Sequence, residues 1–362
     1  MSATIKHIDI KGVQIPVIFE EQKALPILNL QLVFQNSGYI QDKNKSGLVS
    51  LSSKLLNEGT KELGATKFAQ KLEENAISLA TSNGFETFVI ELSNLKEQSK
   101  KGIELLTALL KSPNYTQDTL NKLKTMQTGS LKRKENDFDY VANNQLKSVL
   151  FKGTTLENSA AGTIESISKI ELKDIENFIS QTVCLENLII VAGGDFELKE
   201  FEKLVKPLLE TLNVGKKAQL EEVNFISKKE EKVLIKDTQQ AYIYFGSSFN
   251  INSKDEENYK AKVASFILGG SGFGSRLMEE IRVKRGLAYS AYGSISINKS
   301  HSYFNGYLQT KNETADEAKK LVGEIIEDFV KNGVTNDELS AAKNFLTGSE
   351  PLRSETLSQR LN

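Results

Sequence analysis

The sequence predicts an α+β protein made of two similar domains, each a mainly antiparallel sheet with helices packed on one face. The chain has 362 residues, which is more than one ordinary core organises and about right for two domains. One order of elements, namely strands, two helices, two strands and further helices, occurs twice along it. A polar stretch without clear periodicity, residues 214–230, separates the copies and is typical of a linker. We therefore expect a first domain at residues 1–213 and a second at 231–362.

In the first copy, alternating apolar residues predict strands at 4–20 and 27–35. Apolar residues with a helical period predict helices at 46–60 and 65–76, and residues 77–92 predict a hairpin that turns at Asn83–Gly84. The remaining elements are helices at 95–110, at about 117–151, within 163–181 and at 197–212, with a closing strand, NLIIVAGGDF, at 187–196.

The second copy repeats this order. It has strands at 232–237, 239–249, 286–297 and 302–311, and helices at 256–268, 275–285, 315–333 and 336–350. Nothing in it corresponds to the closing strand of the first copy, so we expect the second domain to be C-terminally incomplete within residues 231–362.

Composition limits the classes of partner. The formal net charge is −1, so nothing indicates a nucleic-acid partner or an anionic membrane surface. The chain has no apolar run long enough for a transmembrane helix, and its N-terminal residues lack the apolar core of a signal peptide. We expect a cytoplasmic protein, with the periplasm as the alternative if a signal peptide has been removed.

Cysteine and histidine are scarce. The single cysteine, Cys184, cannot form an internal disulfide and is expected to be a buried packing residue. The two histidines, His7 and His301, lie at opposite ends of the chain in strand-like segments, so they cannot share a helix. A metal site built of several histidines is therefore excluded.

The glycine-rich segment LGGSGFGSRLMEEIR, residues 268–282, does not follow a phosphate-binding pattern. Its glycines fit neither the P-loop nor the dinucleotide spacing, and a helix rather than a strand precedes them. We predict a turn between two helices.

The helix SGLVSLSSKLLNEGT, residues 46–60, combines a leucine face with a polar face that carries Ser50, Ser53 and Lys54. These three positions have the spacing at which some zinc peptidases place His, Glu and His. Ser50 and Lys54, four residues apart, are also close enough on a helix to meet. A peptidase that uses a serine–lysine pair is therefore a third and weaker hypothesis.

Three segments carry a resemblance to a known family: residues 46–60, the closing strand 187–196, and GGSGFGSRLMEEIRVKRGLAYS at 269–290. Together they resemble the pitrilysin, insulinase and mitochondrial-processing-peptidase family of zinc metallopeptidases, which carry an H-x-x-E-H motif. The resemblance places the two zinc histidines at Ser50 and Lys54, the general base at Ser53 and the third ligand, a Glu, at about Ser130. None of these residue types is retained, so it implies no metal in this chain and no hydrolysis by this chain alone.

The family's second site is retained. Arg282 and Tyr289 match an Arg/Tyr pair that holds the substrate backbone and donates to the scissile carbonyl. On residue chemistry alone, Arg282 is a helix-terminal cation and Tyr289 a strand aromatic. The resemblance implies a non-catalytic subunit that pairs with a zinc-bearing homologous subunit as a heterodimer and binds peptide substrates. The alternative is a structural or peptide-binding pseudo-peptidase, for example a homodimer, with no part in catalysis.

Overall fold

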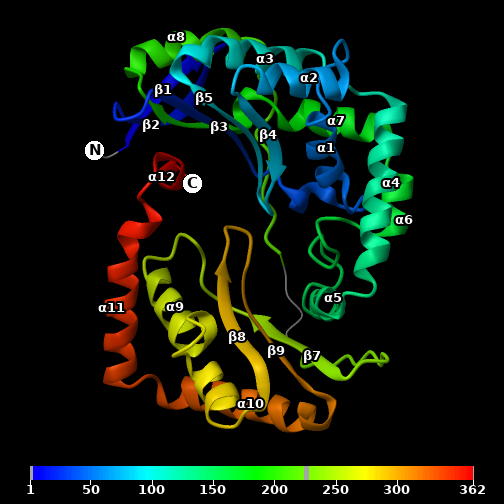
Figure 1. Ribbon diagram of the computed structural model, residues 1–362, viewed down its shortest axis with the longest axis vertical. Coiled ribbons are helices and arrows are strands. Elements are labelled where there is room, and N and C mark those ends of the chain that lie inside the picture. The colour runs from blue at the N-terminus through cyan, green and yellow to red at the C-terminus, as the bar shows by residue number, and fades with distance from the viewer. Residues whose placement is uncertain (1–2, 224–227, 362) are drawn as a thin grey trace. The chain divides into compact units, whose positions relative to one another are not determined.

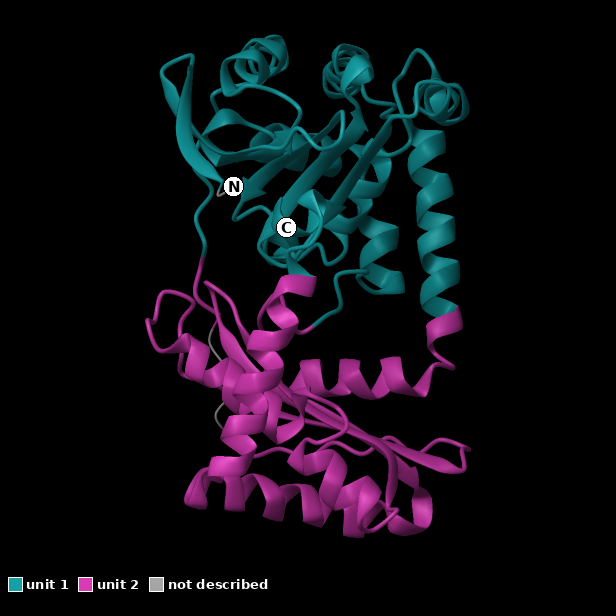
Figure 2. Cartoon of the chain, turned by 60° about the vertical axis from the view of Figure 1, so that its left-hand side comes forward, with its two compact units in different colours: residues 1–132, 158–220, 353–362 teal, residues 133–157, 221–352 magenta. Residues whose placement is uncertain are grey.

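The computed structural model describes residues 3–223 and 228–361 (Figure 1). The chain divides into two compact units that interleave along the sequence (Figure 2). Unit 1 comprises residues 1–132, 158–220 and 353–362, and unit 2 comprises residues 133–157 and 221–352. Each unit contains its own sheet and its own apolar core, which confirms the predicted α+β class with mainly antiparallel sheets.

Unit 1 is built on a six-stranded sheet in the order β1-β2-β6-β3-β5-β4. Its strands are β1 Thr4–Ile10, β2 Val13–Glu21, β3 Ile27–Gln35, β4 Ser78–Asn83, β5 Thr87–Leu95 and β6 Leu188–Gly194. Only β2 and β6 are parallel neighbours. The single strand expected at 4–20 is wrong, because Lys11 and Gly12 have φ of 53° and 82° and form a two-residue hairpin turn.

Helices cover one face of this sheet. On β3, Leu28, Leu30, Leu32 and Phe34 are at most 1% exposed, whereas the alternate residues are only partly buried. Figure 1 shows α3 and α8 lying over the sheet. The helices of unit 1 are α1 Leu48–Leu56, α2 Gly64–Glu73, α3 Ser99–Lys111, α4 Gln117–Lys134, α6 Ile164–Lys169, α7 Leu172–Thr182, α8 Leu198–Leu209 and α12 Leu357–Leu361; the last two residues of α4 belong to unit 2.

The single helix expected at about 117–151 is two helices. Residues 135–137 interrupt it, and α5 begins afterwards at Phe138–Leu150, within unit 2. The carboxylate of Asp137 accepts a hydrogen bond from the Tyr140 amide at 3.1 Å. This side-chain cap starts a new helix, which a periodicity argument does not detect.

Cys184 is fully buried, as predicted, and burial raises the pKa of its thiol. His7 lies in β1, as predicted, whereas His301 immediately precedes strand β9 and is buried. The Oγ of Ser300 lies 2.9 Å from the Nδ1 of His301, and the ring of His301 stacks on that of Tyr303. Both features are those of packing residues.

Unit 2 contains a three-stranded antiparallel sheet in the order β7-β9-β8. Its strands are β7 Gln240–Ser248, β8 Ala288–Ile297 and β9 Ser302–Lys311. Its helices are α5, α9 Asn258–Ser265, α10 Ala315–Asn332 and α11 Asn336–Arg353, with π-helical segments at Phe266–Gly270 and Met278–Val283. In residues 3–223 and 228–361, no helix is long and apolar enough to cross a membrane.

The strand expected at residues 232–237 is wrong, since the segment is irregular. Val233, Leu234 and Ile235 are 75%, 50% and 90% exposed, although they form a typical strand-like run. Among the described residues no strand pairs with this segment, and an apolar run needs a ladder partner to become a strand. Of the predicted linker 214–230, residues 214–223 and 228–230 carry no helix or strand, and residues 224–227 lie outside the described part.

Candidate functional site

The helix α1 carries the degenerate zinc motif and is fixed at its start by a buried carboxylate. Asp42 accepts hydrogen bonds from the backbone N–H groups of Gly47, at 2.8 Å, and Val49, at 2.9 Å. A carboxylate at a helix N-terminus satisfies unpaired donors and complements the helix dipole. Burial raises the pKa of Asp42 to about 7, while the two N–H donors act in the opposite direction.

The polar face of α1 is hydrogen-bonded to strand β4. The Oγ of Ser53 lies 3.0 Å from the Ser50 carbonyl and 3.1 Å from the Oδ1 of Asn83. One turn later, the Asn57 amide donates to the Thr81 carbonyl at 2.8 Å and its oxygen accepts from the Thr81 N–H at 2.7 Å. These bonds fix α1 against the edge of the sheet, so the polar face has a packing function.

Lys54 reaches the neighbouring helix α4. Its ammonium group donates to the Oε1 of Gln127, and the Nε2 of Gln127 donates to the Ala161 carbonyl at 2.8 Å. Gln127 is 4% exposed whereas Lys54 is exposed, so a buried amide binds the end of an exposed lysine side chain. An ammonium group repels Zn²⁺, and the hydroxyl and amide groups beside it are poor zinc ligands at neutral pH. The residues present therefore do not fit the metal of the resembled family.

The third ligand position was predicted at about Ser130. The structure brings Gln127, three residues before Ser130 on α4, to Lys54, a contact that the sequence alone does not reveal. Within the described ranges no cluster of three His, Cys, Asp or Glu side chains is placed to hold a metal ion. The Lys54 ammonium donates to the side chain of Gln127, which argues against the serine–lysine reading.

Restoring the ligands should restore zinc binding. A chain with Ser50→His, Ser53→Glu, Lys54→His and Gln127→Glu is expected to bind Zn²⁺ in calorimetry, because two histidines and a carboxylate then meet where the structure joins the two helices. The matched control carries Ser130→Glu in place of Gln127→Glu and should bind at least about tenfold more weakly. Equal affinities would show that Gln127 does not mark the ligand position.

In unit 2, two backbone irregularities position Arg282 and Tyr289. Arg282 lies in the π-helical segment Met278–Val283, which ends before Gly286, a residue with φ of 62°. Tyr289 lies where the pairing of β8 with β9 shifts register, between Ala288 and Ser290. Such single-turn π-helices and bulges re-aim side chains and are frequent at functional sites.

The two side chains are brought together. The guanidinium carbon of Arg282 lies 4.8 Å from the ring centroid of Tyr289 and 4.8 Å from that of Phe273. Tyr289 and Phe273 are 75% and 69% exposed. In the described part of the chain, no carboxylate pairs with Arg282, so its N–H groups are available to an oxygen acceptor. Phe273, between Gly272 and Gly274 in the predicted interhelix turn, is a member of this cluster that sequence reasoning missed.

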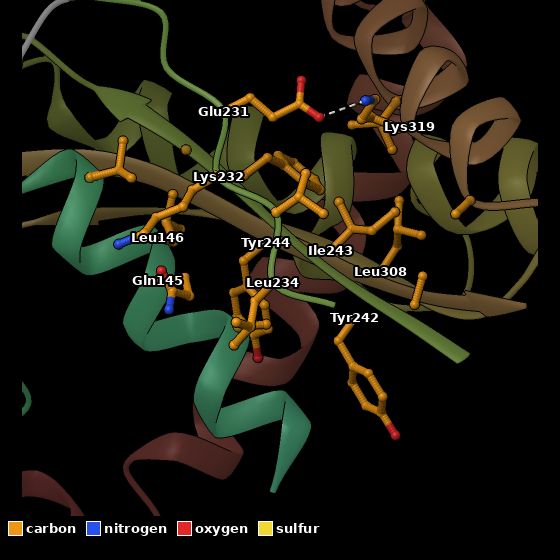
Figure 3. Close-up of a pocket in the computed structure, with 18 of the residues that line it drawn as sticks. Gln145, Leu146, Glu231, Lys232, Leu234, Tyr242, Ile243, Tyr244, Leu308 and Lys319 are labelled. Atoms are coloured by element: carbon orange, nitrogen blue, oxygen red, sulfur yellow. Dashed lines mark hydrogen bonds and ion pairs between the residues drawn. The ribbon is translucent and has the colours of Figure 1, made fainter. Parts of the chain in front are cut away.

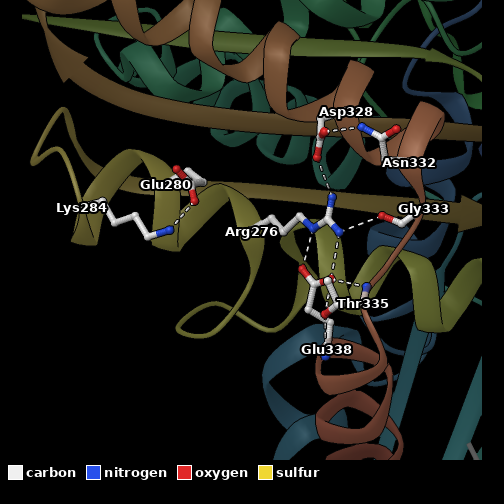
Figure 4. A network of polar contacts seen from close by, with 8 residues as sticks. All are labelled: Arg276, Glu280, Lys284, Asp328, Asn332, Gly333, Thr335 and Glu338. Atoms are coloured by element: carbon white, nitrogen blue, oxygen red, sulfur yellow. Dashed lines mark hydrogen bonds and ion pairs between the residues drawn. The ribbon is translucent and has the colours of Figure 1, made fainter.

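The neighbouring cations are neutralised. Lys284 and Arg285 both pair with Glu280, at 2.6 Å and 2.5 Å. Arg276 binds Glu338 through Nε at 2.5 Å and Nη2 at 2.8 Å, and also contacts Asp328 and the Gly333 carbonyl (Figure 4). These pairs fix the helix that precedes the site, and among the cations of residues 276–285, all within the described part, Arg282 has no anionic partner.

The Arg276–Glu338 pair predicts an acid-sensitive step in the unfolding of unit 2. The Arg276 hydrogen bonds lower the pKa of Glu338 from 4.5 to about 2. Between these two values the unfolded chain binds a proton that the folded chain does not, so the free energy of unfolding falls as pH falls through this window. Urea titrations of Glu338→Gln should show a weaker pH dependence there, whereas Glu317→Gln, outside the network, should behave as the parent chain.

The fold and the residues at the zinc-motif positions define a metallopeptidase-type chain that lacks the metal ligands. Residues 169–346 match the family model described as the peptidase M16 inactive domain. The chain is 46% identical over 361 residues to the non-peptidase homolog YmxG of Helicobacter pylori, covering 100% of this chain and 83% of that protein. The chain therefore belongs to the peptidase M16 family and is a non-catalytic, pseudo-peptidase member of it.

Solved structures agree with this assignment. The peptidase M16 inactive domain from Pseudomonas fluorescens superimposes with a TM-score of 0.86 at 25% identity, over 96% of this chain and 84% of that one. A protease from Helicobacter pylori superimposes with the same TM-score of 0.86 at 18% identity, over 99% of this chain and 87% of that one, and so shares the fold.

Proposed function

We propose that this chain is the non-catalytic subunit of a two-chain peptidase. A homologous subunit would carry the H-x-x-E-H motif and a zinc ion, which would supply a nucleophilic water. This chain would supply Arg282 and Tyr289 to the peptide substrate and contribute no metal ligand.

The arrangement of Arg282 and Tyr289 carries this proposal. Peptide binding requires donors for carbonyl oxygens, and the guanidinium edge offers several donors that no described carboxylate takes up. The exposed hydroxyl of Tyr289 can donate to a carbonyl oxygen that gains negative charge during attack, as in an oxyanion hole. The aromatic ring beneath the guanidinium keeps the two groups together in one orientation.

The peptide itself is expected to bind in extended form. In unit 1, β4 lies at one end of the strand order, and an added strand would bond to its outer edge by displacing the Asn57 amide from the N–H and C=O groups of Thr81. Asn83, at the end of β4, adjoins Ser53 of the degenerate motif. A peptide on this edge would pass the position where active relatives of the resembled family hold the metal.

The second candidate is a peptide-binding or structural protein without any catalytic role. The name of the relative from Helicobacter pylori, a non-peptidase homolog, favours it. In that case Arg282 and Tyr289 would bind a peptide or a protein surface, and the chain would be found with itself or with an inactive partner.

Co-purification distinguishes the two candidates. The chain would be co-expressed with a zinc-bearing M16 homologue from the same organism, and cleavage of a quenched fluorescent peptide library measured for each subunit and for the pair. We expect a stable complex, no cleavage by this chain alone and cleavage by the pair. A zinc-bearing subunit that is equally active without this chain would support the second candidate.

A further inference from the structure

One face of the unit 2 sheet is rich in tyrosine. Side chains alternate between the two faces, and Ile243 and Leu308 point into the apolar core. Figure 3 shows Tyr242 and Tyr244 extending to one side of β7 and Ile243 to the other. The register places these side chains on the tyrosine face: Tyr242, Tyr244 and Ser248 of β7, Tyr303, Asn305, Tyr307 and Gln309 of β9, and Tyr292, Ser294 and Ser296 of β8. Five of the ten tyrosines of the chain lie there, so their position does not follow from composition alone.

Three of these tyrosines form a stacked row across the strands. The ring centroids of Tyr244 and Tyr307 are 5.4 Å apart with an interplanar angle of 17°, and those of Tyr307 and Tyr292 are 5.4 Å apart with an angle of 27°. Helix α5 packs against β7 at the Tyr244 end, where burial and the carboxylate of Asp139 raise the pKa of Tyr244. Tyr307 and Tyr292 are only partly buried, and their hydroxyls form no hydrogen bond within the described part of the chain, so both hydroxyls are available to a ligand.

The Tyr292 end of the row lies beside the candidate site. Tyr292 follows Tyr289 on β8 by three residues, a distance of about 10 Å along a strand. A Cβ at Gly272 would lie 3.6 Å from the ring of Tyr292, so the turn that carries Phe273 lies against this ring. Phe273 in turn contacts the guanidinium of Arg282. An extended peptide held by Arg282 and Tyr289 can therefore reach the row within about three residues of its bound carbonyl.

The side chains of the tyrosine face are uncharged, and besides tyrosine they are serine, asparagine and glutamine. Antibody paratopes have a similar composition, in which rigid tyrosine rings supply contact area and small polar groups supply adaptable hydrogen bonds. A charged ligand side chain placed on this face would lose water without gaining a counter-ion. The chemistry of the face therefore favours an uncharged stretch of polypeptide.

We propose that Tyr292 and Tyr307 form a subsite for an uncharged segment of the same extended peptide whose carbonyl is bound by Arg282 and Tyr289. Their hydroxyls bond to the peptide backbone about three residues from that carbonyl, and their ring edges contact its side chains. The segment carries no Lys, Arg, Asp or Glu where it crosses the row. The subsite rests on the proposed function, because it extends a peptide already held at Arg282 and Tyr289.

Fluorine NMR of the full chain labelled with meta-fluorotyrosine tests the proposal, with each resonance assigned by a Tyr→Phe substitution. The probe is a capped peptide of about ten residues, long enough to span the site and the row, made of alanine, leucine, serine and asparagine. We expect the resonances of Tyr289, Tyr292 and Tyr307 to shift with one common midpoint, and that of Tyr259, exposed on α9, to stay unchanged. Peptides with lysine or with aspartate at central positions should bind at least about fivefold more weakly, whereas the same charges at a peptide end should have little effect.

A matched pair of variants makes the test specific. Tyr307→Phe removes one hydroxyl and keeps the stacked ring, so the neutral peptide should bind about threefold to tenfold more weakly, while Tyr259→Phe should leave its affinity unchanged. If the resonance of Tyr289 shifts and those of Tyr292 and Tyr307 do not, peptide binding stands and the subsite is wrong. Equal affinity for neutral and centrally charged peptides would refute the selection of uncharged segments. If none of the three resonances shifts at millimolar peptide, both the subsite and the proposed binding of peptide by this chain are refuted.

Discussion

In the proposed two-chain peptidase, Tyr289→Phe is expected to lower kcat by roughly 10²–10³-fold with little change in KM. The substitution removes only the hydroxyl and keeps the ring on which Arg282 lies. A donor that acts on developing negative charge contributes to the transition state and little to ground-state binding. Steady-state kinetics of the reconstituted pair would measure the effect, with Tyr259→Phe, another exposed tyrosine of unit 2, as the matched control.

Substitutions of Arg282 should behave differently from Tyr289→Phe. Arg282→Ala is expected to raise KM as well as lower kcat, because it removes donors to the peptide backbone and the support of the Tyr289 ring. Arg282→Lys should recover only part of the loss, since an ammonium lacks the planar fork of donors. If the double variant Arg282→Ala, Tyr289→Phe cleaves peptides as fast as the parent pair, the two side chains have no catalytic role.

The largest effect on stability is expected at Phe34. Its ring is fully buried in the core of unit 1, and Phe34→Ala should lower the free energy of unfolding of that unit by about 3–5 kcal/mol. Phe245, an aromatic residue of β7, is only partly buried, so Phe245→Ala should cost unit 2 less than about 2 kcal/mol. Urea unfolding with hydrogen-exchange assignment of each unit would measure both, and equal losses would contradict the difference in burial between the two rings.

The sequence predicted most elements because their signals are local. The alternation in residues 27–35 and the leucine spacing in α1 follow directly from burial of one face, and both elements form as expected. The sequence did not predict the break at residues 135–137 or the loss of the strand at 232–237. The first depends on a single capping carboxylate at Asp137, and the second depends on a ladder partner that local pattern cannot reveal.

The sequence pointed to two residues of the candidate site but not to their geometry. The resemblance singled out Arg282 and Tyr289, and the structure places them together. Phe273 was missed because an aromatic residue between two glycines carries no periodic signal, and Gln127 was missed because it meets Lys54 across 73 residues of sequence. Contacts of this kind depend on how helices pack against one another, which one sequence does not specify.

The bond between Lys54 and Gln127 has a consequence for how this chain differs from its metal-dependent relatives. The positive charge at this position belongs to Lys54, a residue of α1 itself, and not to a bound metal ion. The packing of α1 should therefore be unchanged during metal starvation or in the presence of a chelator. The same lysine makes a zinc site on α1 difficult to gain by single substitutions. A histidine gained at position 50 alone would still have an ammonium one helical turn away, and Zn²⁺ would be repelled until that lysine had also changed.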